Sequence, residues 1–439
     1  MPTEVGLGAP STHAHRRKAK KATGVAVFGT FIEYYDFSVY GYVAATLSVV
    51  FFPSDDPTTG LLNTLLVFGS AFFVRPLGAL FFGWLGDRKG RRFGLIASVT
   101  VMGVAATLTG LLPGYAQLGA WAPVLLVVFR MLQGFSAGGE VGGASSYIRE
   151  WAEPRRRSVY LSLIPATAQL GKGAAAGMAA IVAAALPAPA MESWGWRIPF
   201  LLALPLGALC LYLRLRVEDS PEFVENSRRR GTTAQPVREL FSEHRKPLAK
   251  VFAIALVQNT GTYIGTVFVA VYFSNILGFS KGAASAIVLV AVLLAGALIP
   301  VAGQLAARSG AKRMLLWSYC AYIVLTVPSF FLMNQGSVAL AMAGLALVMV
   351  PYALCQAGTS ASIPEFFPVQ VRNTGVAFGH SLGAAFGGGG APYLAAWLIG
   401  ISGNTFVPAF ILILAGALGL AVVALTVRET SGSSAHLYR

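Results

Sequence analysis

The sequence predicts an all-α membrane protein with about twelve spanning helices in two six-helix halves. Three observations predict this fold class. First, 55% of the 439 residues are hydrophobic and only 12% are charged, whereas soluble domains carry roughly 25% charged residues. Second, apolar stretches recur along the chain that can cross a bilayer core of roughly 30 Å, which takes about 20 residues of helix. Third, landmarks of the first half return in the second half in the same order.

The spanning elements are expected to be helices, because the alternation of a β-barrel is missing and the bilayer core tolerates no unpaired backbone. The expected spans are 23–50, 61–84, 93–113, 121–144, 158–186, 196–216, 250–277, 283–307, 313–333, 337–361, 372–400 and 404–427.

These spans divide the chain into five parts. A basic tail at 1–22 precedes a first six-helix bundle at 23–216. The stretch 217–249 is polar and charged, so it is expected to link this bundle to a second one at 250–428. A tail at 429–439 ends the chain.

Lys and Arg residues set the expected orientation, because short basic loops resist translocation. They gather in the N-terminal tail and in the second, fourth, sixth and eighth loops, whereas the opposite loops offer only Arg197 and Lys281. Those basic loops and both termini are therefore expected in the cytoplasm, and the chain in the cell (inner or plasma) membrane. The formal net charge of +15 follows this alternation rather than a basic face on a soluble domain, so no nucleic-acid partner is expected.

We expect no metal, no cofactor and no enzymatic activity. Cys210, Cys320 and Cys355 fall far apart inside expected spans, which favours neither a disulfide scaffold nor a metal site. The sequence offers no nucleophile–base set. Gly171-Lys172 is followed by another glycine inside an apolar helix, unlike the phosphate-binding signature of an ATP-driven pump.

Three pairs of segments indicate that the two halves arose by duplication. Each pair follows corresponding helices, and the order is kept. The matched segments are 83–92 with 303–313, 148–155 with 363–372, and 169–177 with 381–390. A parallel pair of six-helix halves is the repeat plan that places a solute site at mid-membrane between the halves.

The segment 83–92, Gly-Trp-Leu-Gly-Asp-Arg-Lys-Gly-Arg-Arg, resembles the loop signature of the major facilitator superfamily, Gly-x-x-x-Asp-Arg/Lys-x-Gly-Arg-Arg/Lys. Segments 33–41, 130–140, 219–223 and 364–375 resemble the metabolite:proton symporter branch of that superfamily. Carriers of 2-oxoglutarate, citrate, shikimate, and proline or betaine belong to this branch. The resemblance covers nearly the whole chain, but it does not identify the solute.

The resemblance implies a monomeric secondary transporter in the lipid bilayer that takes up a small organic solute together with protons by alternating access. The alternative is a proton-coupled antiporter that exports a drug or metabolite. Such antiporters usually carry a fifth helix that resembles Gly-x-x-x-Gly-Pro-x-x-Gly-Gly, whereas no proline follows the glycine in Pro165-Ala-Thr-Ala-Gln-Leu-Gly171-Lys172. Uptake is therefore favoured.

The loop signature also has a direct physical interpretation. Glycines 83 and 90 let helix ends approach a neighbouring backbone, and Asp87 is placed to cap a helix or to pair with Arg91 or Arg92 across the halves. Glu140 is expected near Arg91 or Arg92, and Glu365 with Arg308 or Arg313 is its expected copy. The alternative is that these charges are solvated and only determine topology. The expected gate residues are Gly83, Asp87, Arg88, Gly90, Arg91, Arg92, Glu140, Arg308, Glu365 and Arg372.

Ionisable residues inside the spans point to the solute and proton sites, because burying a charge in a bilayer is costly. Glu33 and Asp36 lie three residues apart on one helix face, and the second half offers only neutral polar groups, among them Gln258, Gln356 and His380. A carboxylate–arginine pair that only locks two helices together is the alternative. The expected solute- and proton-binding residues are Glu33, Asp36, Arg75, Arg130, Gln133 and Lys172.

Lys172 is the most informative of these residues. It lies in mid-helix among glycines, and it is interpreted as a contact for the solute, as a structural ion-pair partner or as a side chain that snorkels to the interface. Intramembrane Arg75, Arg130 and Lys172 oppose Glu33, Asp36 and Glu140, with Glu140 assigned to the gate. The balance favours a carboxylate or zwitterion as the solute.

Overall fold

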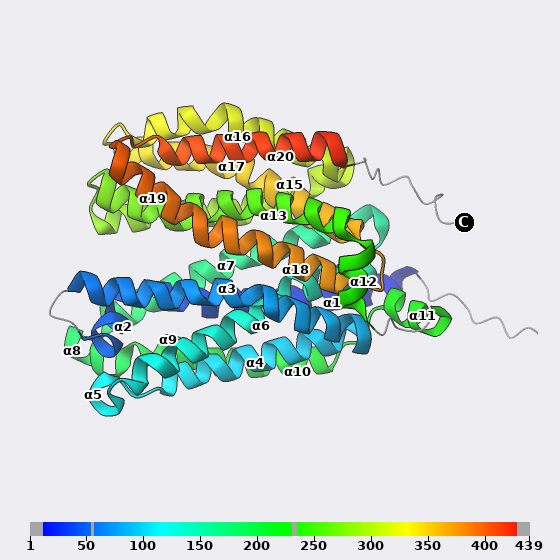
Figure 1. Cartoon of the computed structure of the whole chain (residues 1–439), viewed down its shortest axis with the longest axis horizontal. Coiled ribbons are helices and arrows are strands. Elements are labelled where there is room, and N and C mark those ends of the chain that lie inside the picture. The colour runs from blue at the N-terminus through cyan, green and yellow to red at the C-terminus, as the bar shows by residue number, and fades with distance from the viewer. Residues whose placement is uncertain (1–11, 54–56, 231–234, 428–439) are drawn as a thin grey trace, which may run out of the picture.

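The computed structural model describes residues 12–53, 57–230 and 235–427, and these residues are almost entirely helical (Figure 1). Within these ranges, eleven helical segments are long and apolar enough to cross a membrane. The expected span 23–50 is covered by α1 (Thr12–Tyr42) and α2 (Ala44–Phe51). It is not one of these eleven segments, and Glu33 and Asp36 lower the mean hydropathy of α1. Helix α1 begins inside the expected tail 1–22, whose residues 1–11 lie outside the described part, as does all of 429–439.

The helices that follow match the remaining expected spans to within a few residues at most ends. In the first half they are α3 (Pro57–Lys89), α4 (Arg91–Leu111), α5 (Tyr115–Leu118), α6 (Trp121–Trp151), α7 (Arg157–Ala185), α8 (Ala188–Ala190), α9 (Arg197–Leu201) and α10 (Ala203–Leu215). In the second half they are α13 (Arg245–Tyr263), α14 (Val269–Val271), α15 (Lys281–Ser309), α16 (Ala311–Met333), α17 (Val338–Ser362), α18 (Arg372–Ala384), α19 (Ala391–Ser402) and α20 (Val407–Thr426).

The stretch between the halves contains two short helices, α11 (Pro221–Arg230) and α12 (Pro236–Glu243). Leu240 of α12 is fully buried, and Phe241 packs edge-on against Phe378 of α18. The connecting segment is therefore folded onto one end of the bundles (Figure 1).

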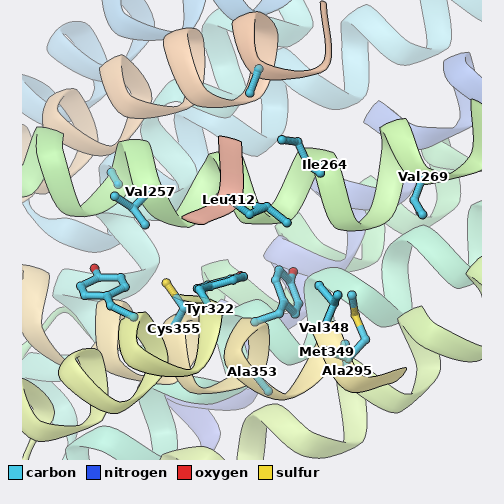
Figure 2. Packing of buried hydrophobic residues seen from close by; sticks show 14 of the residues in the cluster. Val257, Ile264, Val269, Ala295, Tyr322, Val348, Met349, Ala353, Cys355 and Leu412 are labelled. Carbon is cyan, nitrogen blue, oxygen red and sulfur yellow. The ribbon is translucent and has the colours of Figure 1, made fainter. Parts of the chain in front are cut away.

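Two bundles are visible in Figure 1, one of α1–α10 and one of α13–α20. The largest buried apolar cluster lies between Leu240 and Val427, and four smaller clusters lie between Ala19 and Val217. Ala166 and Tyr263 are the exceptions, because each joins a cluster of the opposite half. Figure 2 shows part of the large cluster, including residues from α13, α16 and α17.

The bundles meet along two seams. Helix α18 packs against α3 and α6 in one seam, and α15 and α17 pack against α7 in the other. Glycines permit the close approach: a Cβ at Gly142 would lie 2.5 Å from the Cβ of Ala377, and one at Gly303 would lie 2.1 Å from Ser162 Oγ. Small residues at helix interfaces pack membrane bundles in this way.

One end of the molecule carries the basic loops, and we call it the basic end. It holds the end of α3, the start of α4 and the turn between α6 and α7, with Lys89, Arg92, Arg155 and Arg156. The linker helices α11 and α12 lie at this same end (Figure 1, right).

Candidate functional site

A polar cavity lies between the two halves. Its volume is about 50 Å³, and since roughly 10–15 Å³ on this measure holds one water molecule, it has room for a few waters. The polar residues that line it are Tyr34, Ser145, Gln169 and Lys172 from the first half, and Gln258, Asn259, Thr262, Tyr263, Tyr352, Gln356, Thr359, Ser360 and His380 from the second.

Lys172 of α7 is the one charged side chain among the described residues that line the cavity, with His380 taken as neutral. It is 9% exposed, and its Nζ has no hydrogen-bond partner within the described part of the chain. The nearest aromatic contact is Tyr34, with 5.5 Å from Nζ to the ring centroid. Burying an ammonium without an anion is costly.

The glycines around Lys172 explain its direction. A Cβ at Gly171 would lie 2.4 Å from the carbonyl oxygen of Phe31, so this face of α7 packs tightly on α1. Gly177 has no atom within 4 Å of an added Cβ. Successive residues of a helix point about 100° apart, and Lys172 therefore turns from the α1 contact toward the cavity.

A chain of hydrogen bonds orders the second-half wall of the cavity. Gln258 donates from Nε2 to Oε1 of Gln356, Gln356 donates to Thr262 Oγ1 over 2.9 Å, and the Thr262 hydroxyl donates to the carbonyl oxygen of Gln258 over 2.8 Å. Gln169 of α7 donates to the hydroxyl of Tyr352 over 2.5 Å and so links the two halves. Neutral polar groups thus face Lys172 across the cavity.

One carboxylate–arginine pair and one indirect contact lie in the first half, behind the cavity wall. Arg75 pairs with Glu33 at 3.4 Å. Asp36 accepts from Gln133 over 3.2 Å, and Gln133 accepts from Arg130 over 2.8 Å. All five residues are buried, and none of them lines the cavity. Tyr34 connects this buried cluster to the cavity, because its side chain hydrogen-bonds Arg75 and its ring contacts Lys172.

Aromatic rings surround the two guanidinium groups of this cluster. The carbon Cζ of Arg75 lies 4.5 Å from the ring centroid of Phe37, and that of Arg130 lies 4.7 Å from the same centroid and 4.3 Å from that of Tyr40. These cation–π contacts replace part of the lost hydration. Oε2 of Glu33 and Nη2 of Arg130 still have no hydrogen-bond partner among the described residues.

Asp87 closes the basic end by capping a helix of the other half. Its carboxylate accepts from the backbone N–H groups of Asn373 (3.1 Å) and Thr374 (2.8 Å), and from the hydroxyl of Thr374 (2.6 Å). These residues open α18, where unpaired N–H groups and the helix dipole favour a negative charge. Arg91 also pairs with Asp87. The negative charge thus ties α3 to α18 across the interface.

Glu150 extends this closure. It pairs with Arg91 at 3.1 Å and with Arg372 of the second half at 2.8 Å. Arg149 pairs with Glu365 of the second half at 2.9 Å. Glu222 of α11 lies within 3.2 Å of Arg149 and 3.4 Å of Arg372. The linker and both halves therefore share one ion-pair network at the basic end.

Two expected gate pairs are wrong. Glu140 pairs with Arg214 and accepts from Ser98 over 3.0 Å instead of contacting Arg91 or Arg92, because it lies deep in α6, well before the end of that helix at Trp151. Arg92 instead donates to the backbone of α10.

In the other half, Glu365 contacts Arg149 across the interface and not Arg308 or Arg313. Arg308 is exposed at the end of α15. Arg88 is exposed as well, over the ring of Trp84 at 5.5 Å.

Gly90 and Asp219 fix the start of α4. Gly90 has φ 112°, a conformation that favours glycine. Asp219 accepts from the backbone N–H groups of Arg91 (3.0 Å) and Arg92 (3.3 Å). Burial of the Asp219 carboxyl raises its pKa above the usual value.

Gly83 offers a test of the seam between α3 and α18. A Cβ there would lie 2.6 Å from Cα of Thr374, so Gly83→Ala is expected to push the helices apart and open the basic end. In a background without the three natural cysteines, a cysteine placed at the cavity residue Ser145 should then react faster with maleimide added at that end. Gly69→Ala, on the same helix with no atom within 4 Å, is the control. Equal labelling rates in both variants would contradict the expectation.

Two helical halves with a polar cavity between them, closed at one end by a network of charges, are the arrangement of a secondary transporter. The sequence model of the Major Facilitator Superfamily matches residues 26–388, and the chain belongs to this family.

Similar proteins agree with this assignment. The "Ectoine/proline transporter ProP" of Corynebacterium glutamicum is 33% identical over 425 residues, which cover 93% of this chain and 84% of that protein. The "Proline/betaine transporter" of Escherichia coli K12 is 34% identical and covers 94% and 84%. The proton:xylose symporter XylE, solved with 6-bromo-6-deoxy-D-glucose bound, shares the fold with a TM-score of 0.78 at 17% identity, over 95% and 98% of the two chains.

The predicted family, the twelve-helix fold class and the prediction of a multi-pass membrane transporter rather than an enzyme are confirmed.

Proposed function

We propose that the chain is a proton-coupled symporter that takes up a small zwitterionic carboxylate. The unpartnered, buried ammonium of Lys172 in the cavity carries this proposal, because a solute carboxylate supplies the anion that the described protein groups do not. The names of the relatives support the class, since proline, betaine and ectoine are zwitterions. The solute is expected to bind between the halves, with its carboxylate on Lys172.

The orientation of the chain is part of the proposal. The basic end faces the cytoplasm, following the distribution of Lys and Arg, and both termini lie on that side. The ion-pair network around Asp87 and Glu150 then holds the cytoplasmic side closed. Release of the solute into the cell requires this network to open while the opposite side closes.

Glu33 and Asp36 are the candidates for the proton site. Both are buried carboxyl groups in α1, the helix against which the lysine-bearing α7 packs. Glu33 has one carboxylate oxygen without a described partner, which leaves it a place to bind a proton. Arg75 favours the charged form of Glu33, and burial favours the neutral form. A movement that separates Arg75 from Glu33 is thus able to switch the carboxyl group between loading and release.

Uptake into proteoliposomes tests the function. Proline, glycine betaine, ectoine and 2-oxoglutarate should be supplied separately, with the lumen at higher pH than the bath. Accumulation of a zwitterion above its bath concentration, abolished by a protonophore, is the expected result. Accumulation only when the pH gradient is reversed would favour the antiporter, and downhill flux without saturation would favour a channel.

Asp87→Asn is expected to weaken the closed cytoplasmic side. The substitution keeps the shape but removes the charge that caps α18, a contribution of about 1–3 kcal/mol for a charged hydrogen-bond network. The population should shift toward the inward-open state, and transport should slow while insertion is unchanged. Accessibility of the same cysteine at Ser145 from each side measures this shift. Glu192→Gln, at an exposed acid of the opposite end, is the control, and unchanged transport and accessibility in Asp87→Asn would remove the latch hypothesis.

A further inference from the structure

The hydrogen-bond chain in the second half fixes which atom of Gln258 faces the solute. In the structure the Thr262 hydroxyl donates its proton to the carbonyl oxygen of Gln258, which only accepts. Thr262 Oγ1 therefore accepts from Nε2 of Gln356. That leaves Oε1 of Gln356 to accept from Nε2 of Gln258.

The consequence is a buried acceptor with a defined direction. Oε1 of Gln258 has no partner among the described residues, the side chain lines the cavity and the residue is 8% exposed. The oxygen and nitrogen of a glutamine amide are normally interchangeable. Exchanging them in Gln258 alone would point its NH₂ group into the cavity and would bring its oxygen against the oxygen of Gln356. The structure has the first orientation, in which the chain ends on the Gln258 carbonyl.

The charges around the cavity add a second constraint. No Asp or Glu belongs to the described residues that line it, and Lys172 is on the opposite wall. The positive group of a zwitterion therefore meets neutral acceptors. Two of the three tyrosines that line the cavity already have ring contacts, Tyr34 with the Lys172 ammonium at 5.5 Å and Tyr263 edge-on with Phe72 at 5.3 Å, so an aromatic cage for a methylated ammonium is incomplete.

We propose, on the basis of the proposed function, that Gln258 makes the site selective for zwitterionic carboxylates that carry an N–H donor over fully N-methylated ones. The solute carboxylate binds Lys172 of the first half, and the solute N–H donates to Oε1 of Gln258 of the second half. Such a solute connects the two halves through its carboxylate and its N–H group. A quaternary ammonium group, such as a trimethylammonium group or the ring nitrogen of N,N-dimethylproline, has no N–H to donate. It therefore leaves this buried oxygen unpaired, which is the arrangement that polar sites reject most strongly.

A ligand series with one ring and one carboxylate tests the selectivity. The probes are L-proline with two N–H groups, N-methylproline with one, N,N-dimethylproline with none, and cyclopentanecarboxylate without nitrogen. Binding to the purified full-length protein is measured by titration calorimetry. The wild type should bind proline at least about tenfold more tightly than N,N-dimethylproline, the scale of one hydrogen bond to a charged group, with N-methylproline close to proline.

Gln258→Leu should reduce the proline/dimethylproline ratio to about threefold or less, mainly by weakening proline. Gln304→Leu, at an exposed glutamine of α15 outside the cavity, should keep the wild-type ratio. If Gln258→Leu does not fold, the wild-type series still decides the selectivity.

Equal wild-type affinities for proline and N,N-dimethylproline, or an unchanged ratio in a folded Gln258→Leu, would overturn this inference. The proposed function would then stand if both ligands still lose affinity when Lys172 is replaced. Binding of none of the four probes would overturn the zwitterion class and the inference together.

Discussion

Asp36→Asn and Glu33→Gln, made separately, are expected to abolish uphill accumulation in at least one of the two variants, while exchange of labelled for unlabelled solute persists. Exchange needs no net release of a proton, whereas accumulation under a pH gradient does. A variant that lacks the proton site should therefore lose accumulation and keep exchange. The measurement is proteoliposome uptake with and without a pH gradient, beside counterflow on the same vesicles. If both variants accumulate solute normally, neither acid is the coupling site.

A purely structural role of the Glu33–Arg75 pair gives a different result. Removing one partner of a buried ion pair leaves a buried charge, which costs about 3–5 kcal/mol of stability, whereas replacing both partners is often neutral. Glu33→Gln would then lower the melting temperature and reduce accumulation and exchange together. The double variant Glu33→Gln with Arg75→Met should restore both activities if the pair is only a lock. It should restore stability but not accumulation if Glu33 carries the proton.

Much of the fold follows from the sequence because the bilayer imposes it. Twenty apolar residues in a row leave the backbone one way to satisfy its hydrogen bonds, so spans such as 313–333 and 337–361 lie within a residue or two of α16 and α17. The N-terminal part of α1 is less predictable. Its residues from Thr12 are basic and polar, but contacts such as Lys18 with Glu218 and Lys21 with the carbonyl of Arg216 continue the helix beyond the apolar stretch.

Gate pairs were harder to predict than gate residues. The loop signature marks Asp87 as chemically important, and Asp87 both caps α18 and pairs with Arg91. The partners of Glu140 and Glu365 depend instead on the depth and rotation of helices that are remote in sequence. Glu140 shows the difficulty, because its depth in α6 brings it to Arg214. Glu150, near the end of the same helix, instead pairs with Arg91, the partner expected for Glu140. The pairing of Glu222 with Arg149 follows from the placement of the linker helix α11, whereas Arg149 reaches Glu365 from the end of α6.

The cavity divides the predicted site residues in the same way. Lys172 stands out in the sequence because a charge in a span is rare. Gln169 and Tyr352 carry no such signal, since single neutral polar residues are common in membrane helices, and their contact joins residues 183 positions apart. Gln258 and Gln356 are visible as polar groups of the second half, but only the hydrogen-bond chain through Thr262 shows which atom is free.

Lys172→Met is expected to weaken binding of a zwitterionic carboxylate by about 1.5–3 kcal/mol, the scale of a hydrogen bond to a charged group. Methionine keeps the length and the apolar stem and removes the charge. An analogue in which an amide replaces the carboxylate, such as prolinamide beside proline, should lose little, because it makes no ion pair with Lys172. Titration of both ligands on wild type and variant gives the two differences directly. Lys246→Met, at an exposed lysine near the start of α13, is the matched control.

The comparison of the two ligands separates binding from packing. Lys172 is one residue from the glycine that packs on α1, and its stem also lies near Tyr34. A substitution that disturbed this packing would change the cavity for every ligand, and proline and prolinamide would lose affinity equally. Loss for proline alone assigns the carboxylate to the ammonium. Loss for neither ligand would place Lys172 outside the binding site and would remove the observation on which the proposed solute class depends.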